Sequence, residues 1–156
     1  MRPAIRVSYL HGDQFELAIR QHRLRVDQPV GDGGEDSAPT PTELFVSSLA
    51  SCIAFYARRY LARHDMTTEG LSVETEFTMA ARPARVAEIT IHLRVPEEVP
   101  EDKRAALLAV ARHCTVHNSL EAPPTVTLEF EERPIKNAVQ ILRVDTQIDV
   151  LEKRPA

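Results

Sequence analysis

A long, almost uninterrupted apolar segment from Leu44 to Ala57 constrains the fold of this chain more than any other feature. Thr40 can act as an N-cap before it, Pro41 occupies the favoured first helical position, and Glu43 completes the spacing of a capping box. The pattern predicts a helix from about Pro41 to about His64, ~35 Å long at ~1.5 Å per residue. The apolar run is shorter than the ~20 residues that span a bilayer, so we expect a buried helix and no membrane partner.

The first half of this helix carries apolar or small side chains nearly all round, and arginines appear only in its later turns. A helix of this kind needs cover on several sides. In a chain of 156 residues a second subunit is a natural source of that cover, so we expect a homodimer.

Segments before the helix alternate apolar and polar residues, as β-strands do. Three of these runs, at 4–10, 15–19 and 22–27, predict a small antiparallel meander. Residues 28–41 are rich in Gly, Pro, Asp and Ser, which predicts a loop that leads into the helix.

Beyond the helix, two alternating runs at 71–79 and 86–95 predict a long hairpin. A second amphipathic helix is expected to open at residues 99–102, with Cys114 near its end. Residues 125–130 read as a strand, and Ala138 to Leu151 as one more strand or an arm. We therefore expect an α+β protein with a single domain over 1–156, in which 131–156 form a C-terminal extension of uncertain packing.

The charge balance argues against one class of partner. The formal net charge is -4 and the isoelectric point is near 5.9, so the chain offers no cationic field for a phosphate backbone and we expect no nucleic-acid binding. The stretch from Arg2 to Leu10 alternates and lacks the apolar run of a signal peptide. We therefore expect a cytoplasmic protein.

Two cysteines, Cys52 and Cys114, are the candidates for chemistry. They stand far apart in sequence and no CxxC is present, so neither a disulfide scaffold nor a zinc ribbon is encoded. A lone cysteine on an apolar helix is more often a small core residue, and this is the alternative for Cys52. Cys114 is flanked by His113 and His117, which is a weak indication of a metal site or of a Cys-His nucleophile. If the cysteines act, we expect a spatial pair with no metal and no cofactor.

Two segments resemble the signatures of a known family. APTPTELFVSSLASC contains Cys52, and HCTVHNSL contains Cys114; both resemble the cysteine segments of the OsmC family. This family covers osmotically inducible protein C and the organic hydroperoxide resistance proteins. VDQPVGDGG, before the helix, is also similar to the family's loop at that position. The resemblance spans roughly Val7 to Phe130.

The resemblance implies an OsmC-like fold, with antiparallel sheets wrapped around two central helices in an intertwined homodimer. It implies a thiol-dependent peroxidase for organic hydroperoxides, active in the oxidative stress response, in which Cys52 attacks the peroxide and Cys114 resolves the sulfenic acid as a disulfide. A lipoylated protein, thioredoxin or a small thiol would be the reductant. In the family an arginine stabilises the thiolate and a glutamate orients it. Arg25 best matches that arginine, and Arg20 and Arg23 remain possible.

The glutamate is where the sequence departs from the family. In the hydroperoxide resistance branch it follows the proline at once, whereas here Thr42 follows Pro41 and Glu43 comes one residue later. A shift of one residue turns a helical side chain by ~100° and leaves Glu43 ~13 Å along the axis from Cys52, on roughly the opposite face. Glu43 then serves the partner subunit's site or only the cap. The alternative function is an OsmC-like redox-responsive or small-ligand-binding protein with weak or no peroxidase activity.

Overall fold

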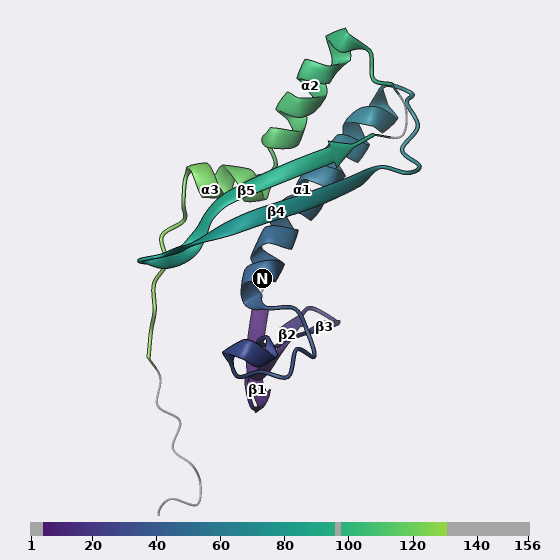
Figure 1. Cartoon of the computed structure of the whole chain (residues 1–156). Coiled ribbons are helices and arrows are strands. Elements are labelled where there is room, and N and C mark those ends of the chain that lie inside the picture. Colours follow the sequence, from purple (N-terminus) through teal and green to yellow (C-terminus); the bar gives the residue numbers. More distant parts are fainter. Residues whose placement is uncertain (1–4, 96–97, 131–156) are drawn as a thin grey trace, which may run out of the picture. The chain divides into compact units, whose positions relative to one another are not determined.

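Two antiparallel sheets and three α-helices make up the described part of the chain, residues 5–95 and 98–130 of this computed structural model (Figure 1). By contacts the chain divides into two units, Met1–Pro123 and Pro124–Ala156. All of the described helices and strands belong to the first unit. This arrangement confirms the predicted α+β class.

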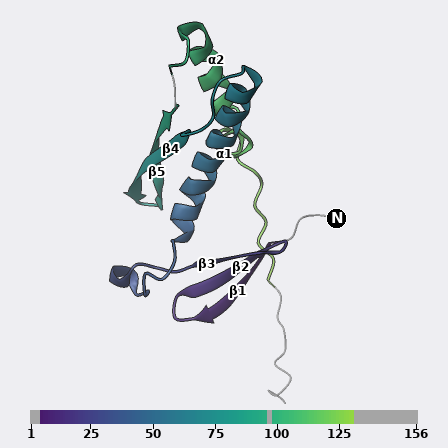
Figure 2. The same ribbon diagram turned by 90° about the vertical axis from the view of Figure 1, so that its right-hand side faces the viewer.

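The first sheet contains β1 (Ile5–His11), β2 (Gln14–Ile19) and β3 (His22–Val26) in that order, which confirms the predicted meander (Figure 2). Directly paired residues share a face, and the pairing separates apolar from polar side chains. One face carries Ile5, Val7, Tyr9, Phe15, Leu17, Leu24 and Val26. The other carries Arg6, Ser8, Glu16, Arg23 and Arg25. The apolar face is largely uncovered, since Val7 is 57% exposed and Tyr9 65%.

The loop after β3 is organised around the buried carboxylate of Asp27. This carboxylate accepts hydrogen bonds from the backbone N–H groups of Gln28, Glu35 and Ser37 and from the Ser37 hydroxyl. The backbone N–H of Ser37 is the largest cause that lowers the pKa of Asp27 from its ordinary value. A Cβ on Gly34 would collide with the Gln28 carbonyl oxygen, so a close approach of the backbone requires glycine here. Inside this loop lies a single 3-10 turn, η1 (Val30–Asp32).

Helix α1 (Pro41–Arg63) begins and ends close to where the sequence predicts. The Thr40 hydroxyl accepts from the Glu43 N–H at 3.1 Å, and the Glu43 carboxylate accepts from the Thr40 N–H at 2.7 Å. The predicted capping box is therefore present. It satisfies two backbone donors that would otherwise have no partner at the helix start.

Helix α1 is the centre of packing in the first unit. It contacts α2 (Glu101–Arg112), α3 (Thr115–Glu121) and the hairpin of β4 (Ser72–Ala81) and β5 (Ala84–Arg94), which lie around it in Figure 1. The hairpin confirms the predicted pairing of two alternating runs. One core cluster is built on Ala57, Tyr60 and Leu61. A second contains Leu49, Ile53, Ala111 and Cys114.

A small-sided face of α1 is left open towards β4. It lines a groove of about 880 Å³ with Ser47, Ala50, Ser51 and Ala54. The helix therefore lacks the all-round cover that its composition demands, within the residues that the structure describes.

Two expectations are wrong in this region. Cys114 does not lie in the second helix, because α2 ends at Arg112 and Cys114 adopts an extended backbone (φ -75°, ψ 152°) as the N-cap of α3. Residues 125–130 form no strand, because their backbone has no regular secondary structure. A strand needs a hydrogen-bonded neighbour, and alternation alone does not supply one. The expected element at 138–151 and the extension 131–156 fall outside the described residues, so the single-domain boundary stays a prediction.

Candidate dithiol site

Cys52 and Cys114 meet where α1 packs against the start of α3. Both are free thiols, and Cys52 acts directly on the Cys114 thiol although 62 positions separate them in sequence. Cys52 packs against the second core cluster, of which Cys114 is a buried member. Helix α1 supplies the Cys52 side of this pocket, and the break between α2 and α3 supplies the other.

The two thiols differ in exposure. Cys114 is 0% exposed, whereas Cys52 is partly exposed. A dissolved reactant can therefore reach Cys52 in the described structure more readily than Cys114. This difference in exposure is expected where one thiol reacts with a substrate and the second thiol reacts only with the first.

Burial raises the pKa of the Cys114 thiol, and the hydrogen bond and charge of neighbouring Cys52 raise it further. The backbone N–H of His117, which donates to the Cys114 sulfur at 3.4 Å, acts in the opposite direction. The net direction is upward, so Cys114 is a protonated thiol at neutral pH.

An apolar cavity of about 580 Å³ opens between α1, β5, α2 and α3, and neither cysteine is among the residues that line it. It shares Leu49, Ile53 and Ala111 with the core cluster that holds Cys114. Three polar side chains, Arg112, His117 and Glu121, also line it. The cavity combines an apolar wall with a few polar groups, which is the usual composition of a small-molecule site.

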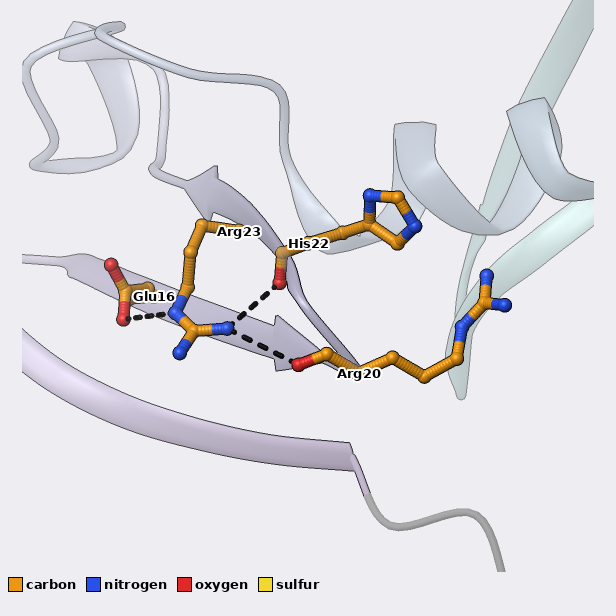
Figure 3. Close-up of polar contacts among 4 residues, drawn as sticks. All are labelled: Glu16, Arg20, His22 and Arg23. Atoms are coloured by element: carbon orange, nitrogen blue, oxygen red, sulfur yellow. Dashed lines mark hydrogen bonds and ion pairs between the residues drawn. The ribbon is translucent and has the colours of Figure 1, made fainter.

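The three candidate arginines have different surroundings, and Figure 3 shows those of Arg20 and Arg23. The Arg23 guanidinium donates to the carbonyl oxygens of His22 and Arg20 and forms an ion pair with Glu16, Nε to Oε1 at 3.5 Å. Arg20 occupies the turn after β2 with φ of 56°. Arg25 is exposed, and its side chain has no hydrogen bond or ion pair among the described residues. In the same part of the chain, none of these arginines bonds to either cysteine.

Glu43 stays at the start of α1, where its carboxylate is held in the capping box. Glu43 and Cys52 are nine positions apart on one continuous helix, which places the two on roughly opposite faces. The structure thus brings the two cysteines together, but it does not bring Glu43 to them.

The metal interpretation of the histidines finds no support in the geometry. His113 caps the C-terminus of α2, while His117 lies in α3 and pairs with Glu121, Nε2 to Oε1 at 3.6 Å. Within residues 5–95 and 98–130, no group of three or more His, Cys, Asp or Glu is placed to hold a metal ion. A membrane-spanning helix is likewise not found in this part of the chain.

Sequence reasoning missed the pairing of His117 with Glu121. The spacing of four residues was the available signal, because such residues share a helix face. Neither Gly nor Pro marks the break at Cys114, so the true start of α3 is not visible in the sequence.

Comparison with known proteins identifies the fold family. The model of the OsmC-like protein family matches residues 33–129. No curated protein is similar enough in sequence to match. Among solved structures, a protein of Psychrobacter arcticus 273-4 assigned to osmotic stress induction and the detoxification response is 26% identical, with a TM-score of 0.69 over 74% of this chain and 85% of that one.

Two further structures show the same fold at lower identity. An OsmC like protein of Mycoplasma pneumoniae is 18% identical, with a TM-score of 0.65 over 79% of this chain and 89% of its own. An organic hydroperoxide resistance protein of Elizabethkingia anophelis is 17% identical, with a TM-score of 0.60 over 77% and 89%. Since the family model covers well over half of the sequence, this chain belongs to the OsmC-like protein family.

Proposed function

We propose that this protein is a thiol-dependent peroxidase that reduces organic hydroperoxides through Cys52 and Cys114. The observation that carries the proposal is the contact between a partly exposed thiol and a buried one beside an apolar cavity. Several structural neighbours, such as the one from Elizabethkingia anophelis, are named for organic hydroperoxide resistance, which supports the same activity.

The proposed cycle has three balanced steps. The Cys52 thiolate attacks one peroxide oxygen and the O–O bond breaks, so that Cys52 becomes a sulfenic acid. The alkoxide that leaves takes up the proton that the Cys52 thiol released and departs as an alcohol. The Cys114 sulfur then displaces the hydroxyl as water and forms a disulfide with Cys52. Two electrons from an external thiol reductant, a lipoylated protein, thioredoxin or a small thiol, return both cysteines to thiols.

Arg25 is our proposed cation for the Cys52 thiolate. Its guanidinium has no partner among the described residues, whereas that of Arg23 is already bound to Glu16. An opposite charge nearby favours the thiolate form of a cysteine. Because Glu43 faces away from the Cys52 of its own chain, any catalytic part that it takes belongs to the partner subunit's site.

The apolar cavity supports a preference for organic substrates over hydrogen peroxide. An alkyl or aryl group that buries ~100 Å² there gains ~2.5 kcal/mol, more than tenfold in specificity, before any ordering cost. Hydrogen peroxide has no apolar surface to bury. We also propose that the protein works in the cytoplasm, where thiol reductants keep both cysteines reduced.

The functional unit that we propose is a homodimer. Two surfaces of the single chain are uncovered: the apolar face of the β1–β3 sheet and the small-sided face of α1. A second copy carries both surfaces and can therefore cover them reciprocally.

Hydroperoxide consumption by purified variants tests the function. With cumene hydroperoxide and an excess of a dithiol, the unmodified protein is expected to turn over. Cys52→Ser is expected to be inactive, while Cys114→Ser consumes one equivalent and stops with Cys52 oxidised. Equal activity of Cys52→Ser and the unmodified protein would overturn the proposal.

The position of Glu43 favours a second candidate, a redox-responsive or small-ligand-binding protein with weak or no peroxidase activity. The second-order rate constant of Cys52 oxidation separates the two. A value no higher than that of a free thiol at the same pH supports the second candidate, and a value at least a hundredfold higher supports the peroxidase.

A further inference from the structure

One face of α1, next to the cysteine pair, carries an exposed aromatic ring with a cation stacked on it. The Arg59 guanidinium carbon lies 5.6 Å from the centre of the Phe55 ring, and Phe55 is 52% exposed. This distance is within the range of a cation–π contact. We infer that this face is the docking surface for an acidic protein that delivers its dithiol to the Cys52–Cys114 disulfide. The inference rests on the proposed function, because it names how that cycle recruits its reductant.

Helix geometry brings the residues of this surface together. Helix α1 is continuous, and each residue of a helix turns by ~100° about its axis. Phe55, Arg59 and Arg63 therefore lie within about 60° of Cys52 around the axis, and these four residues form what we call the docking face. Helical side chains lean towards the N-terminus, and the contact with Phe55 holds the Arg59 charge on the side of its own turn that faces Cys52.

The two arginines of the docking face are exposed, and neither takes part in an ion pair within residues 5–95 and 98–130. The helix dipole favours a cation in the last turn, which explains Arg63, but Arg59 lies before that turn. The formal net charge of the chain is -4, so two unpaired cations beside the partly exposed thiol are a local exception. Carboxylates are the groups that complement arginine in charge and shape.

The difference in exposure between the cysteines indicates which reactant uses this face. Cys114 is buried and Cys52 is partly exposed, so a reductant has to attack the disulfide at the Cys52 sulfur. Aromatic rings and arginines are enriched in protein–protein interfaces, so we assign the face to a protein and not to a small thiol. Ala50 and Ala54, on the small-sided face proposed for the dimer, lie about 160° from Cys52 around the axis. Contact between subunits there leaves the docking face free.

The reduction that this surface serves is a thiol–disulfide exchange with a protein dithiol. The first thiolate of the reductant attacks the Cys52 sulfur, the S–S bond breaks, and the Cys114 sulfur leaves with the proton that the attacking thiol released. The second thiol of the reductant then attacks the sulfur that is joined to Cys52. The Cys52 sulfur leaves with the second proton. Both cysteines are reduced by two electrons, and the reductant becomes a disulfide.

Reduction by matched peptides tests the docking face on the full chain. The protein is oxidised with diamide, and free-thiol counting follows its reduction by a Cys-x-x-Cys peptide flanked by four glutamates or by four glutamines. Each rate is divided by that of the same peptide with hydroxyethyl disulfide, which removes differences in thiol reactivity. We expect the acidic peptide to react about tenfold faster at low ionic strength, because opposite charges concentrate it at the surface. Near 1 M salt, where charges are screened, this advantage should disappear.

Variants assign the advantage to the docking face. Arg59→Gln combined with Arg63→Gln should abolish it, and Phe55→Leu, which removes the ring but keeps an apolar side chain, should reduce it. Arg6→Gln combined with Arg85→Gln is the matched control, because it removes the same charge from exposed positions on β1 and β5. Equal rates of the two peptides with the unmodified protein would overturn the inference. An acidic advantage that survives loss of both docking-face arginines would do the same.

Oxidation by diamide also separates this inference from the proposed function. If peroxide leaves both thiols unchanged but diamide joins them, the peroxidase proposal fails, and the peptide rates alone decide the docking face. If peroxide is reduced but the two peptides react alike, the cycle stands and the docking face is wrong. Failure of diamide to form the disulfide would overturn the inference, because the reductant would then have no disulfide to reduce.

Discussion

Individual residues differ most clearly at the cysteine pair, where one thiol is partly exposed and the other is buried with a raised pKa. Iodoacetamide reacts with thiolates, so at pH 7 the reagent should label Cys52 first and leave Cys114 unlabelled. Because the pKa of Cys114 lies above its ordinary 9.0, its labelling in the folded protein should begin only at higher pH. Peptide mass mapping measures both sites, and rapid labelling of Cys114 at pH 7 would show that the thiol is neither buried nor protonated.

The role of Arg25 is also a prediction at the scale of one residue. Arg25→Met should move the alkylation profile of Cys52 to higher pH and slow its oxidation at neutral pH about tenfold, the equivalent of one pKa unit. Arg23→Met removes a neighbouring arginine that is already paired with Glu16 and is the matched control. Identical profiles for Arg25→Met and the unmodified protein would remove Arg25 from the site.

Among the elements, the loop around Asp27 has an expected response to acid. The carboxylate has a pKa below its ordinary value of 3.8, chiefly through its hydrogen bonds, so its stabilisation is complete above pH 3.8 and is lost as the pH falls through the lowered value. Hydrogen exchange at Gln28, Glu35 and Ser37 should then accelerate. In Asp27→Asn these amides should exchange rapidly at every pH. An acid transition that persists in this variant would assign the effect to another group.

How far the sequence predicts the elements depends on whether the signal is local. The capping box at Thr40 and the alternation within β4 and β5 are local patterns, and the structure confirms both. The break between α2 and α3 at Cys114 depends on a sulfur that accepts a backbone N–H, and no Gly or Pro marks it in the sequence. The strand expected at 125–130 failed for a different reason, since pairing requires a neighbour that the alternation cannot identify.

The site could be predicted from the sequence only in part. That Cys52 and Cys114 lie together depends on contacts between distant segments, and it was expected only if both cysteines were active. Their different burial follows from the tertiary structure and could not be read from the sequence. By contrast, helix geometry predicts that Glu43 and Cys52 lie on roughly opposite faces of one helix. The continuous helix α1 has this arrangement.

For the whole molecule, the uncovered face of the β1–β3 sheet is the feature with the clearest consequence. Val7 lies on this apolar face, and Ser8 points to the opposite, polar face. A charge in an apolar interface is costly to bury, so Val7→Asp should shift the expected dimer to monomer, while Ser8→Asp should not. Analytical ultracentrifugation measures this, and a dimer that is equally stable in both variants would place the interface elsewhere.

The most direct test of the dithiol peroxidase is intact mass and free-thiol counting after one equivalent of cumene hydroperoxide. The proposed cycle predicts that both thiols disappear and that the mass of the chain falls by about two units, the loss of two hydrogens in one disulfide. Two remaining thiols and an unchanged mass would contradict it, as would a chain in which Cys52 gains oxygen while Cys114 stays free.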